Sequence, residues 1–122
     1  MEARVVRCHS DIEEEVEIEV RSQRMEVFVE ECSTPLAVGH TYPVHLSLVV
    51  LDDDELQIGG DGPDFIKPLG GGRYRVRGTL RNHATLESCD LLFDVSELVD
   101  EVTPGAVVEI SADRVSASFL DG

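Results

Sequence analysis

Four arginines stand within nine residues of the chain and could form a site for an anion. They lie in the segment RYRVRGTLR (73–81) as Arg73, Arg75, Arg77 and Arg81. Alternate side chains of an extended strand point to the same face, so the four guanidinium groups would share one side. A guanidinium group is a planar fork of N–H donors that matches phosphate and carboxylate groups. The stripe therefore predicts a surface that binds an anionic small molecule.

A structural role for the same arginines is the favoured interpretation. Glu15, Glu17 and Glu19 repeat at the same two-residue spacing in EVEIEVR (15–21). Opposite charges that face each other across a sheet contribute about 0.2–1 kcal/mol per pair. We therefore expect the arginine and glutamate stripes to pair with each other.

The segment 52–72 is an acidic loop rich in glycine and proline. Its carboxylates that could meet a basic partner are Asp52, Asp53, Asp54, Glu55, Asp61 and Asp64. Long loops in small domains are often functional, which makes this one a candidate docking surface. A calcium site is a weaker alternative, because an EF-hand that started at Asp52 would have Leu56 and Gln57 where an oxygen ligand and glycine are needed. A merely solvated loop is the third interpretation.

Motifs for catalysis and for metal binding are missing from the sequence. There is no Gly-x-Ser-x-Gly, no Walker A lysine motif, no Cys-x-x-Cys and no His-Glu-x-x-His. The histidines are scattered as His9, His40, His45 and His83. We therefore expect no enzymatic activity, no cofactor and no metal.

The three cysteines indicate a reducing compartment. Cys8, Cys32 and Cys89 form an odd set, and the sequence starts without the apolar core of a secretory signal. The longest apolar run, at 46–51, has the length of a strand and is far too short to cross a membrane. These features predict a cytoplasmic protein without a membrane segment.

The overall charge narrows the class of partner. The chain has 122 residues and a formal net charge of −15. Affinity for nucleic acid depends on Lys and Arg that displace counterions from phosphates, so this charge disfavours nucleic acid and anionic membranes. A strongly negative field favours basic proteins. The simpler alternatives are that the charge keeps the protein soluble or reflects a bias of the whole proteome.

Alternating hydrophobicity predicts strands along most of the chain. A hairpin is expected at about 13–31, although Ser10 and Glu13 also match a helix capping box. Further strands are expected at 42–52, 73–81 and 86–95, with a short one at 55–58. Residues 106–120 are expected to form one long strand or two strands broken near Ser111–Asp113. One helix of about two turns is expected near 96–102, after the capping pattern of Asp94 and Glu97.

These elements predict a single all-β domain over residues 1–122. Six to seven mostly antiparallel strands and one short helix would form a small barrel or a sandwich. The arrangement resembles an OB-type barrel, covering about 25–120 after the N-terminal hairpin. This resemblance is architectural and implies no function.

The favoured function is a non-enzymatic, acidic interaction module that docks a basic protein, as an inhibitor or immunity-type protein does. The acidic loop would supply the carboxylates, and Phe28, expected on the outer face between Glu26 and Glu30, would supply an apolar anchor. One alternative is a barrel that binds an anionic small molecule at the arginine stripe. Another is a structural subunit that assembles through a free strand edge, including as a homo-oligomer.

Overall fold

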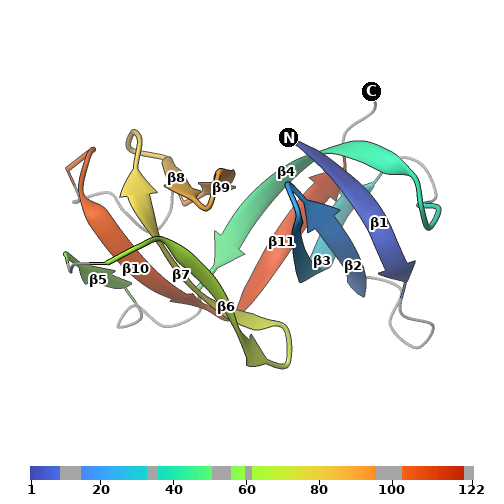
Figure 1. Cartoon of the computed structure of the whole chain (residues 1–122), viewed down its shortest axis with the longest axis horizontal. Coiled ribbons are helices and arrows are strands. Elements are labelled where there is room, and N and C mark those ends of the chain that lie inside the picture. The colour runs from blue at the N-terminus through green and yellow to red at the C-terminus, as the bar shows by residue number, and fades with distance from the viewer. Residues whose placement is uncertain (9–14, 33–35, 51–55, 60–61, 96–102, 120–122) are drawn as a thin grey trace.

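The computed structural model describes residues 1–8, 15–32, 36–50, 56–59, 62–95 and 103–119. In this part of the chain every regular element is a strand, and the strands form one continuous sheet (Figure 1). The strands are β1 (Glu2–Cys8), β2 (Glu15–Val20), β3 (Gln23–Cys32), β4 (Thr41–Val49), β5 (Leu56–Ile58), β6 (Phe65–Gly70), β7 (Arg73–Leu80), β8 (Thr85–Ser88), β9 (Leu91–Asp94), β10 (Val107–Ala112) and β11 (Arg114–Phe119).

Five of these strands close into a barrel. The sheet runs β1–β2–β3–β11–β4, and β4 also pairs with β1, which completes the ring. The pairing of β3 with β11 is parallel, whereas the other pairings in the ring are antiparallel. This is the connectivity of an OB-type barrel, with β11 as its fifth strand.

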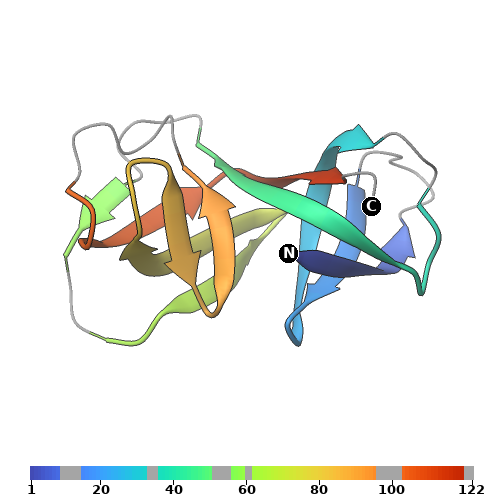
Figure 2. The ribbon, with the colours of Figure 1, turned by 90° about the horizontal axis from the view of Figure 1, so that it is seen from above.

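The remaining strands, β5 to β10, are inserted between the fourth and fifth strands of the barrel. They form a second lobe, and β4 and β11 connect the two lobes (Figure 2). The inserted lobe is centred on β7, which pairs with β6, β8 and β10. It joins the barrel sheet through the parallel pairing of β9 with β4, and β10 leads directly into β11 at Asp113.

The strands form where the sequence alternates between apolar and polar residues. On β2 and β7, successive side chains are alternately buried and partly exposed, as a sheet with one face toward solvent requires. The buried side chains of both lobes belong to one hydrophobic core, which includes Ile18 and Leu46 of the barrel and Val76 and Phe93 of the inserted lobe. The two lobes therefore share one core.

Tight turns separate several of the strands. The β2–β3 turn has positive φ at Arg21 and Ser22, and the β8–β9 turn has positive φ at Cys89 and Asp90. Two consecutive positive φ angles are the signature of a type I′ turn, whose twist matches that of a hairpin. The β8–β9 turn explains why the single strand predicted at 86–95 forms two strands.

The prediction of a small, mostly antiparallel β-barrel is confirmed. The hairpin predicted at about 13–31 forms as β2 and β3, and both strands belong to the barrel ring. The N-terminal strand β1 and the division of 86–95 into β8 and β9 were not predicted. Strand β6 was not predicted either, because it lies within the segment 52–72 that was expected to be a loop. The predicted helix near 96–102 lies outside the described residues. In the part of the chain that is described, no helix is long and apolar enough to cross a membrane.

Candidate functional site

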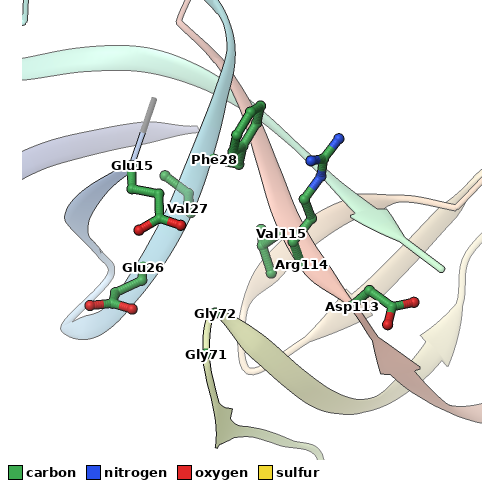
Figure 3. Close-up of a pocket in the computed structure, with 9 residues that line it drawn as sticks. All are labelled: Glu15, Glu26, Val27, Phe28, Gly71, Gly72, Asp113, Arg114 and Val115. Atoms are coloured by element: carbon green, nitrogen blue, oxygen red, sulfur yellow. The ribbon is translucent and has the colours of Figure 1, made fainter. Parts of the chain in front are cut away.

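A pocket of about 210 Å³ lies between the barrel and the inserted lobe (Figure 3). Its wall on the barrel side comes from β2, β3 and the start of β11, and its opposite wall comes from the turn between β6 and β7. The lining residues are Glu15, Glu26, Val27, Phe28, Gly71, Gly72, Asp113, Arg114 and Val115. Three carboxylates and one guanidinium group thus surround a small hollow.

The sheet register explains how the acidic and aromatic residues reach this pocket. Glu15 of β2 is directly opposite Phe28 of β3, and Glu17 is opposite Glu26. All four side chains therefore project from the outer face of the barrel, because residues two apart on a strand share a face. In Figure 3 the Glu15 and Glu26 carboxylates lie on the barrel side, across from Gly71 and Gly72.

A hydrogen bond from the barrel to Tyr74 holds the inserted lobe beside the pocket. The backbone amide of Glu26 donates to the Tyr74 hydroxyl at 2.7 Å. The first β3–β11 pair is Phe28 with Ser116, so Glu26 lies just before the point where β11 begins to pair. Strand β11 does not pair with β3 at Glu26. The Tyr74 hydroxyl therefore accepts the hydrogen bond that a neighbouring strand would otherwise accept at this position. Burial raises the pKa of Tyr74, the bond from the Glu26 amide lowers it, and the charges of Glu26 and Glu17 raise it further.

Arginines of the barrel neutralise one end of the glutamate stripe. Oε1 of Glu19 lies 3.2 Å from Nη2 of Arg4, and Oε2 of Glu19 lies 3.4 Å from Nε of Arg24. Glu17 lies 3.9 Å from Arg7. The carboxylate of Glu15, at the pocket end, makes no hydrogen bond or ion pair with any residue that the structure describes. The stripe therefore ends in a carboxylate whose charge is not balanced by a bonded partner.

The aromatic wall of the pocket already holds a cation. The Arg114 guanidinium lies over the Phe28 ring, 4.2 Å from its centroid. Phe28 is half-buried and projects from the outer face, where alternation predicts it. No group of three or more His, Cys, Asp or Glu among the described residues is arranged to hold a metal ion. The pocket carboxylates therefore do not converge on a single small ion.

The predicted pairing of the arginine stripe with the glutamate stripe is wrong. Arg75 forms an ion pair with Glu109 of β10 and donates to Ser111 at 2.9 Å and to Gln57 at 3.4 Å. Arg81 pairs with Glu87 of β8. Opposite charges do face each other across the sheet, but the partners belong to the inserted lobe. The two stripes lie in different lobes, a separation that alternation alone does not reveal.

Among the described residues, the other two arginines of the stripe form no ion pair. Arg73 is exposed. The Nε of Arg77 is buried and has no hydrogen-bond partner, and its side chain passes close to Gly62, where an added Cβ would lie 3.4 Å from Nη1. Ion pairs and hydrogen bonds within the inserted lobe therefore engage Arg75 and Arg81, two of the four arginines predicted to bind an anion.

Most of the predicted acidic docking loop lies outside the described residues, namely Asp52 to Glu55 and Asp61. Asp64 is described and is exposed. The pocket contains residues that were not predicted as a site, among them Asp113, Arg114 and the Gly71–Gly72 turn. In the sequence, Asp113 and Arg114 lie at the expected break between two late strands, and the turn lies in a run of three glycines. Neither feature indicates that these two segments meet.

The fold and the pocket together define an OB-type barrel protein with a β lobe inserted before its last strand. The chain belongs to the family described as "Uncharacterised conserved protein UCP019853", whose model matches residues 1–120. Comparison with curated proteins and with solved structures finds no match.

Proposed function

We propose that the protein is a non-enzymatic binding module that docks a basic protein partner through its acidic surface. The observation that carries this proposal is the pocket between the lobes, where Glu15, Glu26 and Asp113 gather beside Phe28. Charged residues with an aromatic anchor in a partly desolvated hollow are typical of the centre of a protein interface. The net charge of −15 would steer a basic partner toward this surface.

The bonding of the arginines supports the same proposal. The ion pairs of Arg75 and Arg81 within the inserted lobe neutralise half of the stripe, so less positive charge remains to attract an anionic partner. Exposed Asp64 belongs to the loop of 52–64, which stays part of the proposed docking surface. We expect the module to act in the cytoplasm, because its three cysteines are an odd number for disulfide pairing.

Affinity capture at low salt, followed by elution in a salt gradient, tests this proposal. The captured partner would be identified and purified, and its association rate measured at several ionic strengths. We expect a basic protein whose association rate falls steeply with salt, because charge steering is screened over about 10 Å at 0.1 M salt. A partner whose association does not depend on salt would contradict the proposal. Size-exclusion mass measurement would show whether a second copy of the chain is the partner instead.

One observation favours a second candidate, the binding of an anionic small molecule at the arginine stripe. Arg77 has a buried Nε without a hydrogen-bond partner among the described residues, and Arg73, at the start of the same strand, is exposed. Titration with inorganic phosphate, followed through the backbone amides of β6 and β7, tests this candidate. Saturable shifts that are lost in Arg77→Gln would support it, and unchanged spectra would exclude it.

A further inference from the structure

The pocket between the lobes has the size and the chemistry to hold one arginine side chain. We propose that it receives a guanidinium group from the basic partner. This inference rests on the proposed function, because it names the chemical group by which that partner is recognised. It assigns the site to Glu15, Glu26 and Phe28 on the barrel and to the Gly71–Gly72 turn on the inserted lobe.

The size of the pocket favours a single side chain. Pockets for drug-sized ligands and cofactors enclose roughly 300–1,000 Å³. This pocket has a volume of about 210 Å³ and is partly open to solvent. A side chain that enters from a docked protein needs such an opening for its backbone, whereas a cofactor would need a larger enclosed volume.

The placement of the carboxylates favours a guanidinium group over an ammonium group or a metal ion. The described acidic residues do not converge closely enough to hold a metal ion. An ammonium group is a compact point charge, whereas a guanidinium group spreads five N–H donors over a plane and can reach carboxylates on two strands. Glu15, which has no bonded partner in the described structure, is the first acceptor that we assign to it.

The aromatic wall provides an independent indication of a planar cation. The Arg114 guanidinium already lies 4.2 Å from the centroid of the Phe28 ring. This contact shows that the ring stacks with a guanidinium group. The three carboxylates of the lining outnumber the single positive charge of Arg114. Glu15 is directly opposite Phe28 in the sheet register, so a second guanidinium at Glu15 would lie next to the same ring.

Titration of the whole chain with small probes tests the inference without the partner. The probes are N-acetyl-arginine amide, N-acetyl-lysine amide and the uncharged N-acetyl-citrulline amide, each followed by amide chemical shifts. We expect the arginine probe to give saturable shifts at Phe28, Gly71 and Gly72, with the lysine probe about tenfold weaker and the citrulline probe inactive. Equal binding of the arginine and lysine probes, or no saturable shift in the pocket, would overturn the inference.

Matched variants test the role of Glu15. Glu15→Gln removes one of the three pocket carboxylates, the one assigned as the first acceptor. Glu30→Gln makes the same change of charge at an exposed position outside the pocket lining. We expect Glu15→Gln to weaken the arginine probe about tenfold and Glu30→Gln to leave it within twofold of the original chain. Phe28→Leu is a second test, since it keeps an apolar side chain but removes the ring, and it should also weaken the probe.

The same variants separate this inference from the proposed function. If the partner still binds with steep salt dependence and Glu15→Gln behaves like Glu30→Gln, the guanidinium site is wrong while the acidic docking surface stands. If no basic partner binds at all but the arginine probe still saturates the pocket, the pocket chemistry is supported and the docking function fails.

Discussion

The glutamate stripe of β2 and the arginine stripe of β7 are built alike but end differently. Each alternates along the outer face of a strand, and each is paired in part with opposite charges from its own lobe. At the end of the glutamate stripe, Glu15 faces a pocket. In the arginine stripe, the unpaired Nε of Arg77 is buried where its side chain passes close to Gly62.

This difference separates structural charge from charge that is available to a ligand. A charged side chain with a partner on the neighbouring strand contributes to sheet pairing, and it must lose that contact before it can bind anything else. Glu15 has no such contact within the described structure and lies beside an open hollow. The arginine stripe, which looks more unusual in sequence, therefore has two of its four side chains engaged within its own lobe.

The largest expected effect is on the packing that supports the arginine stripe. A Cβ added at Gly78 would lie 2.2 Å from the carbonyl oxygen of Glu87, so Gly78→Ala must push β7 and β8 apart. We expect a loss of roughly 3 kcal/mol in the free energy of unfolding, measured by urea denaturation. Thr79→Ala on the same strand is the control and should cost less than about 1 kcal/mol. Original stability in Gly78→Ala would show that the two strands are not in close contact.

The second prediction tests whether the arginine stripe is structural. Arg75→Glu would place a carboxylate beside Glu109 and remove the bonds to Ser111 and Gln57. We expect a loss of about 2 kcal/mol in the free energy of unfolding. The exchanged pair, Arg75→Glu with Glu109→Arg, should recover part of this loss, which a double-mutant cycle in urea would measure. Full stability in the single variant would contradict a structural role.

The third prediction concerns the contact between the lobes. Tyr74→Phe removes the acceptor of the Glu26 amide and should cost about 1 kcal/mol of unfolding free energy. Because the pKa of Tyr74 is raised in the folded state, the neutral phenol is favoured there. Its contribution to stability is complete below the ordinary pKa of 10.0 and is lost as the pH rises through the folded value. The urea midpoint of unfolding should therefore fall more between pH 9 and pH 11 for the original chain than for Tyr74→Phe. Equal falls in the two proteins would refute the effect.

The smallest expected effect is at the exposed end of the arginine stripe. A hydrogen bond from Arg81 lowers the pKa of Glu87 below its ordinary value of 4.5. This pair contributes to stability above that ordinary value, and the contribution is lost as the pH falls through the lowered pKa. In Arg81→Gln, a titration of Glu87 by NMR should show the pKa returning toward 4.5. An unchanged pKa would mean that the ion pair does not form in solution.

Period-two alternation was sufficient to predict the class of fold. Val16, Ile18 and Val20 are buried and their polar neighbours partly exposed, which follows from the geometry of a strand. The alternation could not show that β10 and β11 belong to different lobes, because one residue, Asp113, separates two strands with similar patterns. Strand order depends on long-range packing, which local periodicity does not encode.

The candidate site was predictable only in part, for the same reason. Phe28 stood out because it interrupts a row of glutamates on an outer face. Arg114 and the Gly71–Gly72 turn reach the pocket from segments far away in the sequence, and nothing in their local composition indicates a neighbour. The predicted partners of the arginine stripe were wrong because complementary spacing is necessary for pairing across a sheet but does not place two strands side by side.

The position of the insertion has a consequence for the order of folding. The barrel ring is closed by β11, which pairs with β3 and β4, and the whole inserted lobe separates β4 from β11 along the chain. Bringing such distant segments together costs loop entropy that no local contact offsets. Once the inserted lobe has folded, its two ends lie close together and this cost falls. A slow-folding inserted lobe would therefore delay closure of the barrel, even where every barrel residue is unchanged.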